Sequence, residues 1–316
     1  MLRYAGRRVA AMVPALLVII VLVFALLRMI PGDPAVFIGG ENIGPEALQA
    51  LRERLGLAAP LPQQFLDYIG SLTQLDLGRS LHTQLPVTSI IGNAITLTAT
   101  IAITSTVVGL VISVPLGVLA AYAKSKGRNR GDGALMAVVM VLDNVPSFWL
   151  SLLLMLGLSY GLGLFPISGA VSWSDPGAMA QRLALPIIVL AVGQVAALTR
   201  VTRSAVVETL GRDYVRTARA MGTPEPTILF RHALPNAALP IITMTGLSFG
   251  RLLAGTVIVE AIFSIPGIGT QLIQAITGRD YPVVQGLILV YALIFLTINV
   301  VTDVVYTRVD PRVRLA

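Results

Sequence analysis

The chain of 316 residues contains no cysteine and only two histidines. Without cysteine it has no disulfide framework, no thiolate metal ligands and no thiol nucleophile. His82 and His232 are far apart in the sequence, and the zinc-protease pattern HExxH is absent. We therefore expect no metal centre and no catalytic residue in this chain.

Charge is also scarce. Only 12% of the residues are charged while 55% are hydrophobic, whereas soluble domains carry about 25% charged residues. Several apolar runs are long enough to cross a bilayer as helices, and a membrane barrel would instead alternate apolar and polar residues. The composition predicts an all-α, polytopic membrane protein.

The apolar runs predict six transmembrane helices. The first, 9–30, reaches about 33 Å as a helix, which exceeds the length of a cleavable leader's apolar core, so we expect it to be retained. The predicted spans are roughly 9–30, 95–122, 134–158, 183–201, 238–263 and 284–306.

The basic residues indicate the orientation. With both termini in the cytoplasm, 16 of the 23 Lys and Arg residues fall in the four cytoplasmic pieces, and only five, including Arg182, fall in outer loops. This distribution follows the positive-inside rule. It also argues against nucleic-acid binding, because the positive charge is split among short loops rather than gathered on one face.

The segment 31–94 is longer than a connection requires, and we expect it outside the cell membrane. It contains two stretches with helical periodicity: 44–57, with Pro45 near its start and Gly56 as its stop, and 63–75. Two interpretations stay open, a structural cap on the outer mouth or a docking site for an external partner.

Ionisable and polar residues inside spans are candidates for a translocation path. Asp143 and Asn144 precede Pro146, which favours a kink, and Arg251 lies amid small residues in the fifth span. Each has a structural alternative: Asp143 as an internal hydrogen-bonding partner, Arg251 as the partner of another subunit. Glu260 lies near the outer end of its span, where we expect it to reach the interface.

The ATP-binding pattern GxxxxGK[ST] is missing, so any ATP and Mg²⁺ must be bound by another chain. Coupling to that chain requires a cytoplasmic docking surface. The segment 204–237 suits this role because it predicts a helix ending at Gly222, a proline turn and a second helix. A basic loop that only sets topology is the simpler alternative, but topology does not need about 35 ordered residues.

One motif in this segment resembles the coupling signature of bacterial ABC importer permeases, which reads E-A-A, three residues, G, nine residues, I-x-L-P. The chain matches it at four positions and departs at Arg216, Thr217 and His232 in the way seen in the peptide/nickel branch of that family. The residues aligned with the motif are Arg216, Thr217, Ala218, Gly222, His232, Leu234 and Pro235.

Further stretches resemble the same branch along nearly the whole chain, among them RMIPGDP at 28–34, VEAIFSIPGIG at 259–269 and RDYPVVQG at 279–286. The resemblance implies a type I importer permease fold in the bacterial cell membrane. It also implies the partners: a second homologous permease forming a heterodimer, two ATPase subunits that bind ATP and Mg²⁺, and an extracytoplasmic substrate-binding protein.

The implied substrate is a dipeptide or oligopeptide, with glutathione and nickel chelates as alternatives. A self-sufficient secondary transporter is the rival from another class, but it should show paired ionisable groups inside the membrane. The expected organisation is 1–30 as N-terminus and first span, 31–94 as external segment, 95–306 as five-helix core with the coupling loop 204–237, and 307–316 as cytoplasmic tail.

Overall fold

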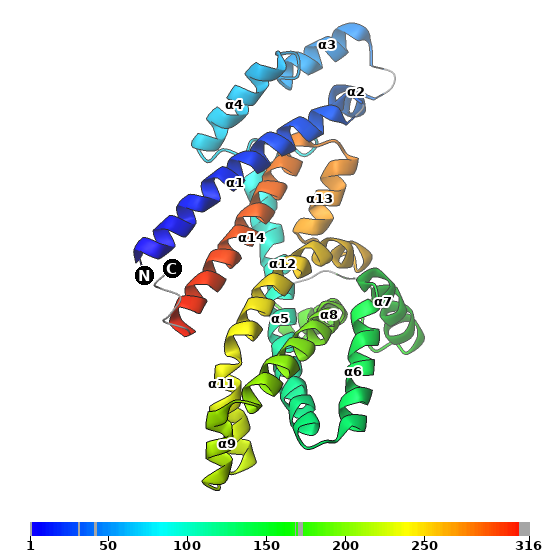
Figure 1. Ribbon diagram of the computed structural model, residues 1–316. Helices are drawn as coiled ribbons and strands as arrows, with labels where there is room; N and C mark the ends of the chain where they lie inside the picture. The colour runs from blue at the N-terminus through cyan, green and yellow to red at the C-terminus, as the bar shows by residue number, and fades with distance from the viewer. Residues whose placement is uncertain (1, 31, 41–42, 168, 170–172, 310–316) are drawn as a thin grey trace. The chain divides into compact units, whose positions relative to one another are not determined.

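The computed structural model describes residues 2–30, 32–40, 43–167, 169 and 173–309, and its helices are labelled in Figure 1. The chain divides into two compact units. One comprises 1–5, 99–265 and 297–316, and the other comprises 6–98 and 266–296. The tail predicted at 307–316 lies almost wholly outside the described residues, and so do the side chains of Arg3, Arg7 and Arg8.

The helical membrane fold is confirmed. The described residues contain no β-strand, only an isolated antiparallel bridge between Arg79 and Pro86. Five helices are long and apolar enough to cross a membrane, and a bent pair supplies a sixth crossing if it counts as one span. The five are α1 Leu2–Met29, α5 Val87–Ser125, α8 Pro176–Leu210, α12 Ala238–Ile262 and α14 Tyr281–Val309.

Two of these helices exceed the lengths expected from hydropathy. α5 has 39 residues and α8 has 35, so at 1.5 Å per residue they extend to about 58 Å and 52 Å, well beyond a hydrocarbon core of about 30 Å. The span predicted at 183–201 was too short, because no Gly or Pro occurs between Val201 and Gly211 and polar residues continue the helix to Leu210.

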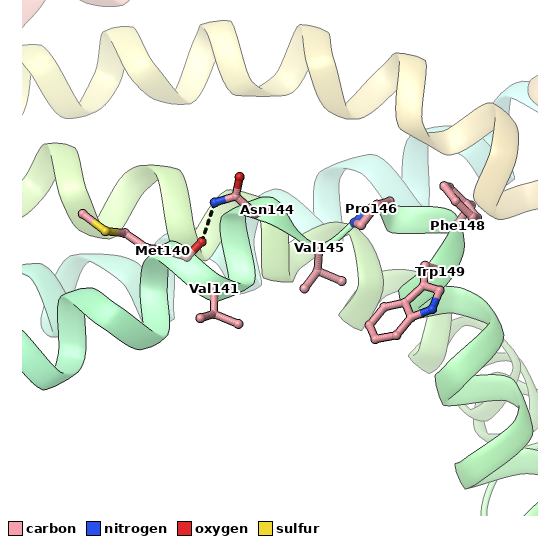
Figure 2. A pocket seen from close by; sticks show the side chains of 7 residues that line it. All are labelled: Met140, Val141, Asn144, Val145, Pro146, Phe148 and Trp149. Carbon is pink, nitrogen blue, oxygen red and sulfur yellow. Dashed lines mark hydrogen bonds between the residues drawn. The ribbon is translucent and has the colours of Figure 1, made fainter.

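The sixth crossing is the bent pair. α6 Asn129–Asn144 is followed after Val145 and Pro146 by α7 Ser147–Leu154 and the π-helix η1 Met155–Gly161, with a bend of 96° at the break. The predicted kink at Pro146 is therefore present. Because Pro146 has no N–H, the Leu142 carbonyl accepts instead from the Val145 N–H at 3.4 Å. Figure 2 shows Asn144 at the break, where its side-chain amide donates to the Met140 carbonyl at 2.7 Å.

The unit of 6–98 and 266–296 contains most of α1, the start of α5, the first half of α14, and α2 Pro34–Gly39, α3 Pro45–Arg54, α4 Leu61–Thr73 and α13 Ile268–Thr277. Its core joins Val23 and Leu27 of α1 to Val87 of α5 and Leu287 of α14. A Cβ at Gly286 would come within 2.6 Å of Val87, so glycine permits α14 to approach α5 closely.

The two short helices predicted within 31–94 are present, and α4 begins and ends two residues before the predicted stretch 63–75. α3 starts at Pro45, and Gly56, with φ of +70°, lies just past its end. On α4 the ring centroid of Phe65 lies 5.1 Å from that of Phe24 on α1, whereas the neighbouring Leu66 is exposed. Burial raises the pKa of Tyr68 to about 12, so this phenol stays neutral beside Phe24.

The unit of 99–265 and 297–309 is organised around α8, which packs against α12, α6 and α7. Small residues allow these helices to approach. A Cβ at Gly117 of α5 would lie 2.5 Å from the Thr202 Cβ of α8, and one at Gly246 of α12 would lie 2.5 Å from Thr302 Oγ1. The small residues predicted in the fifth span thus serve close helix packing at Gly246.

Two polar residues differ from expectation. Arg182, assigned to an outer loop, lies inside α8 and is buried, where its guanidinium donates to the backbone carbonyls of Ile167, at 2.7 Å, and Phe263. Glu260, expected to reach the membrane surface, is fully buried. The hydropathy pattern placed Arg182 and Glu260 near the ends of spans. It cannot show which neighbouring segments cover these residues in the folded protein.

Candidate functional site

The coupling segment begins with a short helix. α9 Asp213–Ala220 follows α8 after a two-residue break and lies at its end (Figure 1). Gly222 ends it with φ of +77°, a left-handed conformation that glycine adopts without a Cβ penalty. The Thr223 N–H donates to the Ala218 carbonyl at 3.1 Å, and the Gly222 N–H to the Arg219 carbonyl at 3.0 Å. These two bonds form a Schellman motif, so the predicted stop is a well-satisfied helix end.

A second helical stretch follows the turn. Pro224 precedes α10 Glu225–Thr227, which continues through the π-helix η2 Ile228–Ala233 into α11 Leu234–Asn236. The predicted order of helix, glycine, proline turn and second helix is therefore present, with a wide π-turn in its middle. That turn is not encoded by any sequence signal we identified.

An apolar core lies beneath these helices. Val215 and Ala218 of α9 and Ile228 and Leu229 of the second stretch are buried in one cluster with α5 and α8. The members from the two long helices are Val118 and Ala121 of α5 and Ala205, Val206 and Leu210 of α8. Because buried side chains interlock at close-packed density, α9 is mechanically joined to the ends of both helices.

The opposite face of the segment is exposed. Tyr214 and Phe230 are exposed, and Met221 has 74% of its surface accessible. Aromatic residues, methionine and arginine are enriched at protein interfaces. Hydropathy alone did not single out these three residues, because each looks like an ordinary core residue in the sequence.

The seven residues of the predicted motif are brought together in this segment but divide between its two sides. Ala218 is buried in the apolar core, and Leu234 packs against it. Arg216 is exposed and pairs with Asp213 at 2.9 Å. The residues on the exposed side are Arg216, Thr217, Gly222 and Pro235, while His232 is half-buried.

Glu225 fastens this segment to the loop between α5 and α6. Its Oε1 lies 2.8 Å from Lys126 Nζ and 3.2 Å from Arg219 Nε. The hydrogen bond from Lys126 lowers the pKa of Glu225, and Arg219 adds to the effect. Sequence reasoning missed Glu225, since nothing in the linear pattern indicates that Lys126, 99 positions earlier, lies beside it.

The residues predicted for a path are split between two hollows. Asp143 and Arg251 line one pocket of about 230 Å³ among α6, α7, α8 and α12. Asn144 lines a wider, largely apolar hollow of about 660 Å³ at the α6–α7 break, together with Val141, Val145 and Trp149 (Figure 2). The structure therefore brings Asp143 and Arg251 together and leaves Asn144 out.

Asp143 also has a structural partner. Its Oδ2 lies 2.7 Å from Arg200 Nη1 on α8, and one helical turn further along α8, Arg203 forms a two-pronged pair with Asp132. Asp143 thus has a partner on a neighbouring helix, as the structural alternative expected, and it also lies in the pocket wall. Neither of these two ion pairs was predicted from the sequence.

A further stretch of α12 has the spacing of a hydrolase nucleophile motif and was overlooked in the sequence: Gly246, Leu247, Ser248, Phe249, Gly250. In hydrolases this motif forms a sharp turn between a strand and a helix. Here it lies within the continuous helix α12, so Ser248 is not held as such a nucleophile. In the described part of the chain no group of three or more His, Cys, Asp or Glu residues has a metal-binding arrangement.

Comparison with known families agrees with this architecture. Residues 1–104 match the model of the N-terminal part of binding-protein-dependent transport system membrane components, and residues 113–315 match the model "Binding-protein-dependent transport system inner membrane component". The chain belongs to this family. It is accordingly a permease subunit of a binding-protein-dependent ABC importer and an inner-membrane component.

Relatives of known name cover the full length. A Brucella abortus (strain 2308) protein named as a peptide transport system permease is 38% identical over 309 residues, 98% of each chain. The glutathione transport system permease protein GsiC of Escherichia coli K12 is 38% identical over 315 residues, 99% of each chain. This full-length family membership supports the resemblance noted in the sequence.

Solved structures share the fold. A chain of the MetNI methionine ABC transporter, in inward-facing conformations, has a TM-score of 0.61 with 18% identity, over 71% of this chain and 97% of its own. A chain of an amino acid ABC transporter with histidines has a TM-score of 0.53 with 17% identity, over 70% of this chain and 94% of its own. At such identities the likeness concerns the fold alone.

Proposed function

We propose that this permease forms half of a translocation pathway for di- or oligopeptides and is driven through α9. Its partners in this proposal are a second homologous permease, two ATPase subunits that hold ATP and Mg²⁺, and an extracytoplasmic substrate-binding protein. Both termini then lie in the cytoplasm, in agreement with the positive-inside distribution. Family membership and the names of the 38% identical relatives support this assignment.

The observation that carries the coupling role is the two-sided construction of the α9 segment. One side is locked into the apolar core with α5 and α8. Tyr214, Met221 and Phe230 of the same segment are exposed to solvent, and so is Arg216. A segment that only sets topology needs neither an interlocked core nor an exposed apolar face.

α8 provides the route from the docking surface to the membrane interior. The same uninterrupted helix contributes Leu210 to the core under α9 and Gln194 to the pocket with Asp143 and Arg251. Sixteen residues separate the two, which is about 24 Å along a helix axis. A displacement of α9 by the ATPases therefore moves the pocket wall as a rigid body, and nucleotide binding shifts the population between inward-facing and outward-facing states.

The test is a substitution at the turn. Gly222→Asp places a charged side chain at a left-handed position on the proposed docking surface, and we expect it to abolish ATPase association or transport while membrane insertion stays normal. Gly56→Asp is the matched control, because Gly56 also lies past a helix end with φ of +70° and open space around it. It carries the same backbone strain far from α9 in sequence.

Co-purification with the ATPases and uptake of labelled peptide in a strain lacking the native gene are the two measurements. Normal peptide uptake by Gly222→Asp would disprove the coupling role. Uptake of glutathione but of no other peptide would transfer the assignment to the substrate named for the Escherichia coli relative. Uptake of a nickel chelate alone would make the nickel chelate, and not a peptide, the substrate of this permease.

A further inference from the structure

Arg251 lines the pocket of about 230 Å³ between α6, α7, α8 and α12, and within the described residues it forms no ion pair. Arg251 lies in the middle of α12 and is exposed, and its one hydrogen bond among the described residues runs from Nη2 to Met244 Sδ at 3.9 Å. Three other arginines of α8 are engaged: Arg200 and Arg203 pair with aspartates, and Arg182 donates to backbone carbonyls. An unpaired guanidinium within a span is costly, which marks it as functional.

The pocket also holds a buried hydroxyl with no partner. Ser248, one helical turn before Arg251 on α12, is 6% exposed, and its Oγ makes no hydrogen bond within the described residues. Gln194 lines the pocket as well, and its amide nitrogen donates to Thr106 Oγ1 of α5 at 3.0 Å. Its Oε1 also makes no hydrogen bond within the described residues, but it lies against Gly109 of α5, so we assign Gln194 to the wall. A buried polar atom without a partner is rare in a folded protein, and at a pocket wall it indicates a ligand.

The electrostatics of this pocket favour an anion. Asp143 is neutralised by Arg200 at 2.7 Å, which leaves Arg251 as the uncompensated charge. α7 begins at the pocket wall with Ser147, and no side chain caps its first turn. The free N–H groups and the positive end of the helix dipole therefore add to the positive potential.

The volume limits what fits. Pockets that enclose a drug-sized ligand measure about 300–1,000 Å³, and this one holds about 230 Å³. One terminal residue of a peptide fits such a space, whereas a whole oligopeptide does not. A guanidinium binds a carboxylate in a planar, two-pronged manner, and a serine hydroxyl complements it as donor or acceptor.

We infer that this pocket binds the C-terminal residue of a transported peptide, with Arg251 on the terminal carboxylate and Ser248 beside it. The inference rests on the proposed peptide-import function and names the group that the pathway recognises. The positive potential of the pocket repels the N-terminal ammonium group of a peptide. The peptide therefore presents its C-terminus to this chain. The remainder of the peptide extends out of the pocket into the pathway.

The experiment uses the complete assembly, reconstituted in proteoliposomes with ATP inside and saturating binding protein outside. Uptake of one labelled tripeptide is compared in three forms: free acid, C-terminal amide and N-acetylated acid. Each form is first shown to saturate the binding protein. We expect the wild type to take up the amide at least tenfold more slowly than the free acid, and the N-acetylated acid at an undiminished rate.

Three variants locate the preference in this pocket. Arg251→Met should lower uptake of the free acid to the rate of the amide and leave the amide rate unchanged. Arg251→Lys, which keeps the charge but not the two-pronged geometry, should retain part of the preference. Ser248→Ala should reduce the preference for the free acid over the amide several-fold. Leu247→Ala, an exposed residue of the same helix outside the pocket wall, is the control and should behave as the wild type.

The outcomes separate the two proposals. If wild-type assemblies take up acid and amide equally, or Arg251→Met keeps the preference, the pocket does not read the carboxylate, while peptide import still stands. If Arg251→Met loses the second permease subunit on gel filtration, the guanidinium serves the subunit interface and the inference is wrong. If no form of the peptide is taken up by wild-type assemblies, the proposed peptide function itself fails.

Discussion

Lys126 and Glu225 are 99 positions apart in the sequence, yet their charged atoms lie 2.8 Å from each other. The contact joins the loop after α5 to the first turn of the second helical stretch, just past Gly222. Arg219, on the last turn of α9, binds the same carboxylate at 3.2 Å. Glu225 thus holds three separate parts of the proposed docking surface in one arrangement.

Replacing this carboxylate should loosen the surface. Glu225→Gln removes both ion pairs, and because all three side chains are partly solvated we expect a loss of about 0.5–1 kcal/mol in unfolding free energy. Thermal unfolding in detergent measures it. Glu208→Gln is the matched control, since its pair with Arg212 is highly exposed and stands alone. A loss from Glu225→Gln no larger than the control's would contradict the bridging role.

The same carboxylate predicts a pH dependence. Its pKa in the folded protein is lowered, first by the hydrogen bond from Lys126 and further by Arg219, from an ordinary value of 4.5. A lowered pKa contributes stability that is fully present above the unfolded-state value and is lost as pH falls through the folded-state value. The melting-temperature difference between wild type and Glu225→Gln should therefore be constant near neutral pH and shrink below pH 4.5. A difference that grows with acidification would overturn this assignment.

Local signals made much of the fold predictable. Long apolar runs indicated the spans, Pro146 indicated the break, and Gly222 and Gly56 indicated helix ends, because each acts through neighbouring residues in the chain. The features that depend on contacts between distant segments were not predictable. They include the partners of Asp143 and Glu225 and the burial of Glu260.

The candidate site follows the same division. The motif residues Ala218 and Gly222 were recognisable because the order of helix, glycine and proline is written in adjacent positions. The pocket was only half recognisable: Asp143 and Arg251 stood out as ionisable residues in spans, whereas Ser248 and Gln194 look unremarkable until α8 and α12 pack together. Asn144, adjacent to Asp143, points to a different hollow because successive helix residues face directions about 100° apart.

Close packing between α5 and α8 leads to a third prediction. A Cβ at Gly117 would lie 2.5 Å from Thr202 Cβ and 2.9 Å from the Thr199 backbone oxygen. The backbone cannot yield cheaply, so Gly117→Ala should destabilise the protein by about 1–3 kcal/mol. Gly92→Ala on the same helix has open space and should be neutral or slightly stabilising. Equal melting temperatures for the two variants would show that the helices are further apart than described.

The two ion pairs between α6 and α8 should differ in strength because they differ in burial. The Asp132 and Arg203 side chains are 10% and 20% exposed and form two hydrogen bonds, whereas the Asp143 and Arg200 side chains are 29% and 38% exposed. Removing one partner of a buried pair leaves an uncompensated charge, so Arg203→Met should cost about 3–5 kcal/mol. Arg200→Met should cost about 1 kcal/mol or less, as for a solvated pair.

A double-mutant cycle checks the cause. Adding Asp132→Asn to Arg203→Met removes the stranded carboxylate, so the double variant should regain much of the stability that the single variant lost. The melting temperatures of the four proteins in detergent, with binding of the ATPases as a second readout, give the coupling. If the losses in melting temperature from Asp132→Asn and Arg203→Met are additive, the two residues act independently. The ion pair then does not stabilise the packing of α6 against α8.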